Sequence, residues 1–432
     1  MEYRPRIADK LLENKLKGMG AVLVEGAKWC GKTTTAEQQA KSILYMDQPK
    51  DRAMNLQLAQ INPELLLDGD TPRLIDEWQI APELWDAVRF TVDHREGEGQ
   101  FILTGSVTPL QDDPSTGSGT EQKIFHSGAG RIARLMMRPM TLWESGDSSG
   151  QISLESLFGG EEKMTGINKL ELQDIAWLIC RGGWPRAVNQ GKDIALGRAF
   201  DYFDTVVNVD IKEPDGVERN PERVKLLMRS YARNQGAQVS LTAISADMKA
   251  NDRDTLDDRT VYSYLKALKG IFVVEDTKAW NPNLRSKSAI RSSDTRYFTD
   301  PSIAVAALGI GPADLMSDLN TLGLFFETLC MRDLRVYAQA LDGEVYHYRD
   351  SDGLECDAVV HLRNGAYGLI EIKLGGESLI NEGVKSLQRL AKKIDTTKMK
   401  SPSFLMVLTA TGKYAFQRED GVWVVPIGTL KE

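Results

Sequence analysis

The chain of 432 residues is long enough for two or three domains, because a domain usually contains about 100–200 residues. With 42% hydrophobic and 26% charged residues, its composition is that of a globular protein. The net charge of -8 argues against a protein that coats nucleic acid along its whole length, although 53 lysines and arginines can still form a local basic face.

The cysteines and the apolar runs indicate the class of protein and its compartment. Four cysteines lie far apart and form no CxxC pair: Cys30, Cys180, Cys330 and Cys356. This spacing gives no zinc signature and fits a reducing cytosol. The amino-terminal residues are charged throughout and lack the apolar core of a signal peptide. Since no uncharged apolar run of about 18 residues occurs, we expect no membrane span and a cytoplasmic location.

The amino-terminal part of the chain alternates short apolar runs with helical patterns. The expected strands are 21–25, 43–46, 73–75 and 100–104, and the expected helices are 33–42 and 82–94. The second helix places Leu84, Val88 and Val92 on one face. Because strands separated by helices of this length form βαβ units, we predict an α/β fold with a parallel, doubly wound sheet.

A glycine-rich loop follows the first of these strands and fits the pattern GxxxxGK(S/T) in full. Its residues are Gly26, Ala27, Lys28, Trp29, Cys30, Gly31, Lys32 and Thr33, with Thr34 next in the helix. Backbone N–H groups of such a loop point at phosphate oxygens, and the following helix directs its positive end at the same phosphates. Lys32 would reach the β- and γ-phosphates, and the Thr33 hydroxyl would coordinate Mg²⁺. We therefore predict a site for ATP and Mg²⁺; a glycine-containing loop without a ligand is the alternative.

An acidic pair closes the strand 73–75. Asp76 and Glu77 stand at the mouth of a buried strand, where carboxylates are costly unless they hold a metal ion or a water molecule. We expect Asp76 to hold Mg²⁺ and Glu77 to polarise the attacking water. The alternative is that both residues cap the following helix or face solvent.

Two further positions are candidates for a catalytic role. Thr104 ends the next strand, before Gly105 and Ser106, and its hydroxyl would lie beside the γ-phosphate. Arg131 could supply positive charge to the transition state, from its own chain or from a neighbouring one. A plain strand-ending turn at Thr104 and a structural ion pair at Arg131 are the alternatives.

The middle of the chain is polar at first and then mostly helical. Residues 108–128 and 146–166 are expected to be loose, and the region up to about 235 to be helical. A short stretch at 239–241, helices from 242 and over 259–269, and a hairpin over 271–280 indicate a winged helix-turn-helix at about 236–280. Its basic residues are Arg253, Arg259, Lys266 and Lys269, and Tyr262 and Ser263 are candidates for base contacts. The module can equally be a joint between domains.

The last segment combines a helix from about Leu322 with strands 344–349, 355–362, 367–374 and 403–408 and a helix over 382–392. Strand alternation would bring Asp357 towards Glu371 and Lys373 on the neighbouring strand, with Glu327 on the preceding helix. This is the PD-(D/E)xK arrangement, in which Asp357 and Glu371 hold Mg²⁺ and Lys373 activates a water molecule at a phosphodiester. Charged residues that merely pair across a sheet are the alternative.

The sequence resembles prokaryotic AAA-type P-loop ATPases that carry an uncharacterised carboxyl-terminal region with a winged helix and a PD-(D/E)xK nuclease-like core. The resemblance rests on stretches that occur in the expected order over most of the chain: GAKWCGKT, LIDEWQIAPELW, FILTGS, GAGRIARLMMRPMTLWE, CRGGWPRAV, RTVYSYLKALKGIFVVEDTKAW, YFTDP, LGLFFE, YHYRDSDGLECDAVV and IEIKLG. Two features depart from the family: Lys28 replaces the more usual arginine, and a polar insertion lies around residues 112–119. The resemblance implies ATP binding without a known biological role.

We therefore predict three domains: an AAA-type P-loop ATPase domain (1–145), a helical region with the winged helix (146–315), and a restriction-endonuclease-like α/β domain (316–432). The leading hypothesis is a Mg²⁺-dependent ATPase coupled to a DNA-facing carboxyl-terminal half. The alternatives are a nuclease gated by nucleotide and a nucleotide-switched regulatory or protein-binding module with slow hydrolysis. Relatives of AAA type often form rings, so oligomerisation is open.

Overall fold

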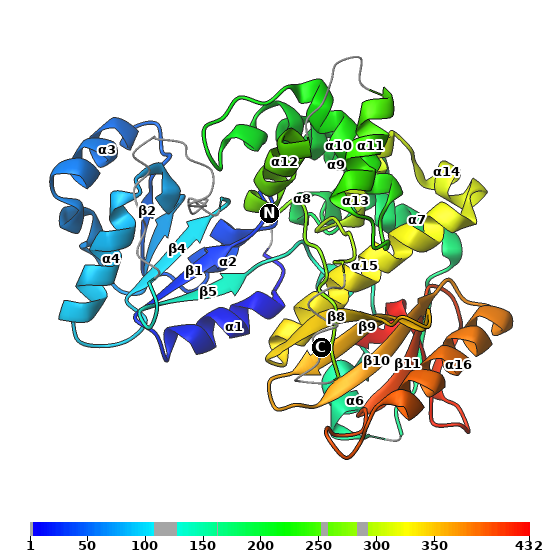
Figure 1. Cartoon of the computed structure of the whole chain (residues 1–432). Coiled ribbons are helices and arrows are strands. Elements are labelled where there is room, and N and C mark those ends of the chain that lie inside the picture. The colour runs from blue at the N-terminus through cyan, green and yellow to red at the C-terminus, as the bar shows by residue number, and fades with distance from the viewer. Residues whose placement is uncertain (1–2, 108–127, 162, 252–257, 283–292) are drawn as a thin grey trace. The chain divides into compact units, whose positions relative to one another are not determined.

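The computed structural model describes residues 3–107, 128–161, 163–251, 258–282 and 293–432. The chain divides into two compact units, each with its own large sheet (Figure 1). Unit 1 contains Met1–Arg138, Asp210–Glu218 and Ala267–Phe272, and unit 2 contains Pro139–Val209, Arg219–Lys266 and Val273–Glu432. Within the described residues, no helix combines the length and the apolar character that crossing a membrane requires.

Unit 1 is built on five parallel strands in the order β2-β3-β4-β1-β5. The strands are β1 (Ala21–Glu25), β2 (Ser42–Tyr45), β3 (Arg73–Asp76), β4 (Phe101–Gly105) and β5 (Ile132–Met136). The helices are α1 (Ile7–Leu16), α2 (Lys32–Glu37), α3 (Arg52–Ile61) and α4 (Glu83–His94). A parallel sheet with helices between its strands agrees with the predicted α/β fold.

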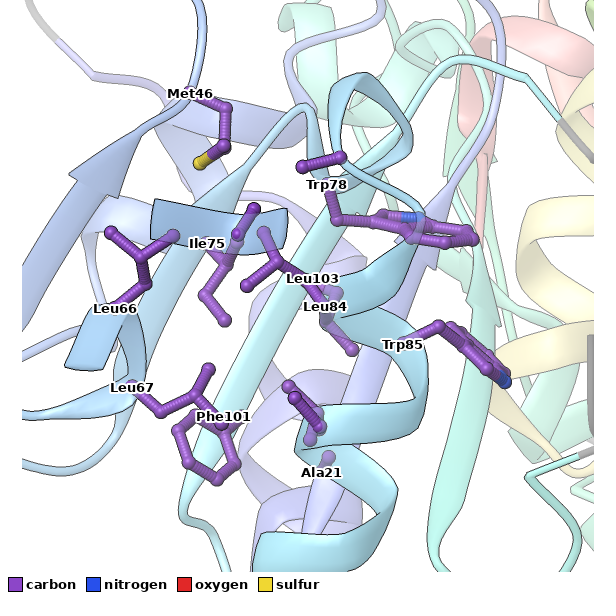
Figure 2. Close-up of a cluster of buried hydrophobic side chains, with 14 of the residues drawn as sticks. Ala21, Met46, Leu66, Leu67, Ile75, Trp78, Leu84, Trp85, Phe101 and Leu103 are labelled. Carbon is purple, nitrogen blue, oxygen red and sulfur yellow. The ribbon is translucent and has the colours of Figure 1, made fainter. Parts of the chain in front are cut away.

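Successive side chains of a strand point to opposite faces of the sheet, and both faces of this sheet carry buried side chains. On one face Leu23, Ile75 and Leu103 pack with Leu84 and Trp85 of α4 (Figure 2). The alternate strand residues pack on the other face with α1, α2 and the loop after β1, in a cluster that includes Leu12, Leu16, Val22, Val24, Cys30, Ala36, Leu74 and Ile102. The loops after β1, β3 and β4 therefore meet at the carboxyl edge of the sheet, where ligands bind in such folds.

Some elements of unit 1 differ from the sequence-based prediction. The helix α2 ends at Glu37 instead of Ser42, because the Gln38 N–H turns back to the Thr35 carbonyl and β2 already starts at Ser42. The prediction contains no α1, α3 or β5. In α1 only Ala8, Leu12 and Leu16 are buried, a stripe too narrow to stand out among charged neighbours. The predicted loop over 108–128 lies outside the described residues except for its last residue.

The helices of unit 2 include one helix that is apolar on all sides. They are α5 (Leu142–Ser145), α6 (Leu154–Gly159), α7 (Leu172–Arg181), α8 (Pro185–Val188), α9 (Lys192–Asn208), α10 (Pro221–Arg233), α11 (Leu241–Asn251), α12 (Asp258–Gly270, whose last turn belongs to unit 1), α13 (Pro301–Leu308), α14 (Pro312–Ser317), α15 (Leu319–Ala340) and α16 (Glu377–Lys393). The sequence of α13, PSIAVAAL, is apolar all round, so this helix is buried and packs against α7, α9, α10 and α15.

The sheet of unit 2 is mixed, with the strand order β7-β12-β13-β11-β10-β9-β8. Its strands are β7 (Gly166–Ile167), β8 (Gly343–Arg349), β9 (Glu355–Leu362), β10 (Tyr367–Lys373), β11 (Phe404–Thr409), β12 (Tyr414–Gln417) and β13 (Trp423–Pro426). The helix α16 covers β9, β10 and β11, and α15 packs mainly on β8. Four of these strands lie close to their predicted ranges.

The sequence predicts a loose connection over residues 146–166, but the structure contains regular elements there. It contains β6 (Ile152–Ser153) and α6, and it leads into β7. The strand β6 pairs in parallel with β14 (Leu430–Lys431), and β7 pairs with β12. Strands of two residues carry no detectable period, so only the fold pairs β7 with the large sheet and β6 with β14.

The two helices predicted for the winged helix are present, but the predicted wing is not a local hairpin. The helices α11 and α12 lie close to their predicted positions, with Tyr262 exposed and Ser263 accepting a hydrogen bond from Arg219 (3.3 Å). Instead of a local hairpin over 271–280, Val274 and Thr277 form antiparallel bridges with residues 298 and 295. Ala279 pairs with residue 347 of β8, and Arg253 lies outside the described residues. The residues of the expected wing are thus joined to the large sheet of unit 2.

A buried ionic cluster holds the helical part of unit 2 together. Arg332 on α15 lies between Asp300 (2.9 Å) and Asp333 (2.8 Å), and all three side chains are at most 1% exposed. Asp300 also accepts from the backbone of Gly183, and the Trp184 indole donates to Ser302. The stretches CRGGWP and YFTDP therefore serve packing, and Trp184 is a core residue.

Candidate functional site

The loop after β1 forms the backbone cradle that its sequence predicts. Gly26 has a φ of 153°, and a Cβ there would lie 2.0 Å from the Met137 carbonyl oxygen, so only glycine fits. Gly31 is left-handed (φ 101°) and starts α2. Ala27 and Cys30 are fully buried, so they offer a ligand only their backbone, whereas Trp29 is exposed and Thr34 faces solvent.

The side chain of the loop lysine forms hydrogen bonds with the backbone of the loop. Lys32 is buried, and its Nζ donates to the carbonyl oxygens of Gly26 and Ala27, both at 2.9 Å. These bonds hold a positive charge beside the backbone of the loop, where a phosphate group would need it. The cradle and Lys32 together can bind a polyphosphate.

Asp76 is positioned by two hydroxyl groups. Thr33 Oγ1 donates to Asp76 Oδ1 at 2.7 Å, and Thr104 Oγ1 donates to the same oxygen at 2.5 Å. Burial raises the pKa of Asp76, and the two hydrogen bonds oppose this rise. A hydroxyl and a carboxylate in contact are the oxygen donors that Mg²⁺ takes beside phosphate oxygens and water. The residues present therefore fit a magnesium ion at Thr33 and Asp76.

Glu77 lies at the turn after β3 in a left-handed conformation (φ 56°). Its N–H donates to Thr104 Oγ1 (3.3 Å), and its Oε2 accepts from Gln79 and from Ser106 Oγ (3.3 Å). Burial raises its pKa, and Lys32 opposes the rise. A carboxylate that is desolvated yet held by two donors is suited to accept a proton from water.

The structure does not bring Arg131 to the phosphate loop of its own chain. Ala21, the first residue of β1, donates its N–H to the Arg131 carbonyl, so Arg131 lies at the amino edge of the parallel sheet. The loop follows Glu25 at the opposite edge. The Arg131 side chain forms an ion pair with Asp93 at 2.8 Å. This geometry agrees with the structural alternative for Arg131 and leaves a catalytic role only towards a neighbouring chain.

Several residues that contact the loop are absent from the sequence-based prediction. Arg6 Nη1 donates to the Cys30 carbonyl at 2.8 Å, and Tyr3 forms a hydrogen bond with Thr35 of α2 at 3.0 Å. Asp210 and Glu213, far away in the sequence, bind the Lys28 ammonium. No local pattern marks such residues, because each acts through a contact over a long sequence separation.

The four predicted residues of the carboxyl-terminal site come together in unit 2. Asp357 on β9 faces β10, where it accepts from the Ile372 N–H at 2.7 Å. Lys373 Nζ contacts Asp357 at 3.2 Å and Glu371 at 2.7 Å. Glu327 on α15 is near enough for the charges of Asp357, Lys373 and Glu371 to affect its pKa. The strand faces meet as the sequence analysis expects.

Both glutamates of this cluster have a raised pKa. Burial and the Asp357 charge raise the pKa of both Glu327 and Glu371 to about 8. Glu327 accepts from the Tyr297 hydroxyl, and a Cβ on Gly236 would lie 2.9 Å from its carboxylate. Within the described residues, no group of three or more His, Cys, Asp or Glu side chains is arranged to hold a metal ion. Asp357 and Glu371 could contribute two ligands.

Comparison with known proteins identifies the amino-terminal region. Residues 19–145 match the family described as "AAA domain", residues 172–314 a domain of unknown function (DUF8612), and residues 322–430 another domain of unknown function (DUF4143). The first match agrees with the parallel sheet and the loop and supports a P-loop ATPase domain in this region. The two other families leave the winged helix and the nuclease-like core as hypotheses.

Two relatives from mycobacteria match most of the chain. The chain is 24% identical over 388 residues to the uncharacterized proteins Mb2031c of Mycobacterium bovis and Rv2008c of Mycobacterium tuberculosis, covering 88% of this chain and 76% of each relative. Among solved structures, the Walker-type ATPase PABY2304 of Pyrococcus abyssi is similar with 13% identity and a TM-score of 0.40, over 71% of this chain and 96% of that one.

Proposed function

We propose that this protein binds ATP with Mg²⁺ and hydrolyses it at the carboxyl edge of the unit 1 sheet. The observation that carries the proposal is the pair of hydroxyls on Asp76: Thr33 from the phosphate loop and Thr104 from β4 both donate to one carboxylate oxygen. A carboxylate that touches the helix start after a phosphate loop is placed for the cation of a bound nucleotide. The match of residues 19–145 to the AAA domain supports the same function.

Each residue has one role in this proposal. Backbone N–H groups from Gly26 to Thr34 bind the phosphates, and Lys32 moves its ammonium from the loop carbonyls to the phosphate oxygens. Thr33 and Asp76 hold the magnesium ion, which neutralises charge on the phosphates when bound. Glu77 accepts the proton of the attacking water, and Gln79 and Ser106 fix its carboxylate.

Two substitutions separate nucleotide binding from hydrolysis. Lys32→Ala removes the cation of the loop and should abolish ATP binding. Glu77→Gln keeps size and hydrogen bonding but removes the base, so it should bind ATP and lose turnover. Lys17→Ala and Glu13→Gln, which break only an exposed ion pair on α1, serve as matched controls. Normal hydrolysis by Glu77→Gln would contradict the assignment of the base, and a folded wild type that binds no Mg²⁺–ATP would refute the function.

A metal-dependent nuclease is the second candidate, favoured by the convergence of Asp357, Glu371 and Lys373 in unit 2. In that function the two carboxylates bind Mg²⁺ and Lys373 orients water at a phosphodiester of DNA. Supercoiled plasmid with Mg²⁺ or Mn²⁺ should then be cut by the wild type and left intact by Asp357→Ala. The control Asp395→Ala removes an exposed carboxylate paired only locally. Cleavage that survives Asp357→Ala would eliminate this site.

The link between the two sites is also a proposal. If the carboxyl-terminal half faces DNA, through the winged helix or the nuclease-like core, single- or double-stranded DNA should stimulate ATP hydrolysis. ATP hydrolysis that is slow and is not stimulated by DNA favours a nucleotide-switched regulatory module. This proposal includes the predicted division of the chain into three domains, residues 1–145, 146–315 and 316–432. A role of Arg131 in a neighbouring chain would require an oligomer, which sedimentation with ATP can detect.

A further inference from the structure

An acidic segment contacts the phosphate loop from outside the P-loop sequence. Asp210 and Glu213 belong to the short stretch 210–218, which is part of unit 1 although it follows α9 in the chain. Lys28 Nζ, which projects from the loop, lies 2.8 Å from Asp210 and 2.6 Å from Glu213. The ammonium of this loop lysine is thus bound by two carboxylates at once.

The contact is well enclosed. Asp210 is 2% exposed, and the side chains of Lys28 and Glu213 are 29% and 30% exposed. Burial raises the pKa of Asp210, whereas the Lys28 and Lys32 charges lower it. Asp210 therefore lies within electrostatic reach of the lysine that we assign to the phosphates. Two carboxylates with this placement are not required by the ATPase mechanism described above.

The charge balance at the loop has a direct consequence. A triphosphate brings several negative charges to a loop where one of the two lysine charges is already neutralised by Asp210 and Glu213. Like charges at such distances repel strongly in a partly buried site. Phosphate oxygens can gain the Lys28 ammonium only if the carboxylates release it.

We propose that Asp210 and Glu213 form an acidic clamp that competes with the triphosphate of ATP for Lys28. This inference rests on the proposed nucleotide site. Binding of ATP and closure of the clamp oppose each other, and by linkage each weakens the other to the same extent. Asp210, the first clamp residue, lies two positions after the end of α9. Release of the two carboxylates from Lys28 therefore transmits the binding of nucleotide to the part of the chain that follows the P-loop domain.

Nucleotide affinity tests the clamp. Glu213→Gln, Asp210→Asn and the double variant are titrated with methylanthraniloyl-ATP and -ADP in Mg²⁺ and compared with the wild type. We expect the double variant to bind the ATP analogue about tenfold more tightly, from the loss of two charges near the phosphates, with a smaller gain for the ADP analogue. Glu218→Gln is the matched control, because Glu218 lies in the same stretch but pairs with Lys212.

A second measurement follows the segment itself. Amide hydrogen exchange over 209–218 should become faster when a non-hydrolysable ATP analogue binds the wild type. Glu213→Gln, with its partly exposed side chain, provides the test if Asp210→Asn does not fold. Unchanged or weaker nucleotide binding by the folded variants, or slower exchange with the analogue, overturns the clamp. A wild type that binds no nucleotide would instead refute the proposed function.

Discussion

Thr104 offers a sharp test of how the acid pair is organised. Its hydroxyl is buried, donates to Asp76 Oδ1 at 2.5 Å and accepts from the Glu77 N–H at 3.3 Å. Thr104→Val keeps the shape of the side chain and removes both bonds. Because these hydrogen bonds of Thr104 reach Glu77 and Asp76 and not Lys32, the substitution perturbs the acid pair and spares the phosphate cradle.

The size of the effect follows from the two bonds. A hydrogen bond to a charged group contributes about 1.5–3 kcal/mol, and a long bond to a backbone amide contributes less. If about 2–3 kcal/mol is lost from the transition state, kcat falls roughly 30- to 150-fold, since 1.36 kcal/mol corresponds to a factor of ten. The Kd for ATP should change less than about threefold, because the loop is intact. Steady-state hydrolysis and a fluorescence titration measure the two quantities.

Two controls make the result decisive. Thr104→Ser retains the hydroxyl and should retain most of the activity. Thr91→Val removes another buried threonine hydroxyl, on α4 and outside the acid pair, and should hydrolyse ATP normally. A Thr104→Val protein with hydrolysis within about twofold of the wild type would refute the reasoning, as would a Thr104→Ser protein that is equally impaired.

Three further outcomes follow from the structure. The pKa values of Glu327 and Glu371, about 8 in the folded chain against 4.5 for the free group, make the folded state lose stability as pH rises through that window; Glu327→Gln should remove its part of this loss and leave the part of Glu371, as thermal unfolding at several pH values would reveal. Gly105→Ala would place a Cβ 2.9 Å from Trp78 Nε1 and shift the turn that carries the acid pair, lowering kcat about tenfold in the ATPase assay. Arg332→Met leaves two buried aspartates unpaired and should cost about 3–5 kcal/mol in urea unfolding.

Each of these three has a contradicting result. A Glu327→Gln protein whose stability still declines with pH as in the wild type would assign the titration to another group. An unimpaired Gly105→Ala enzyme would mean that the indole shifts without moving the acid pair. An Arg332→Met protein as stable as the wild type would show that the two carboxylates are neutralised without the guanidinium.

The sequence predicts those parts of the fold and site in which a local pattern and its chemistry coincide. The run Ala21–Glu25 followed by a phosphate-loop motif predicts a buried strand and its loop, and β1 spans those residues. Asp357 and Glu371 come together because side chains alternate between the two faces along each strand, and the pairing of β9 with β10 keeps this alternation. Strand ranges in the carboxyl-terminal sheet agree for the same reason.

The sequence does not predict features that depend on distant partners. Asp210 contacts Lys28 across 182 residues, and no periodicity marks an acid that is buried by a loop from elsewhere in the chain. For Arg131 the sequence leaves a catalytic role and a structural ion pair open, and only strand direction puts the residue at the amino edge of the sheet, paired with Asp93. The two-residue strands β6 and β7 are defined by their partners alone.

The two carboxylate sites differ in what a cation would have to displace, and this difference is why ATP hydrolysis is the first proposal. At Asp76 the neighbours are hydroxyls, and the Thr33 oxygen can itself become a ligand, so binding Mg²⁺ replaces no ion pair. Asp357 and Glu371 are instead bridged by the Lys373 ammonium at 3.2 and 2.7 Å, and a metal ion must break both contacts. Since a buried carboxylate without its partner is costly, that exchange needs compensation from the metal ligands and the bound phosphodiester. The fold therefore prepares the proposed nucleotide site for a cation, whereas the proposed carboxyl-terminal site would need its substrate to complete it.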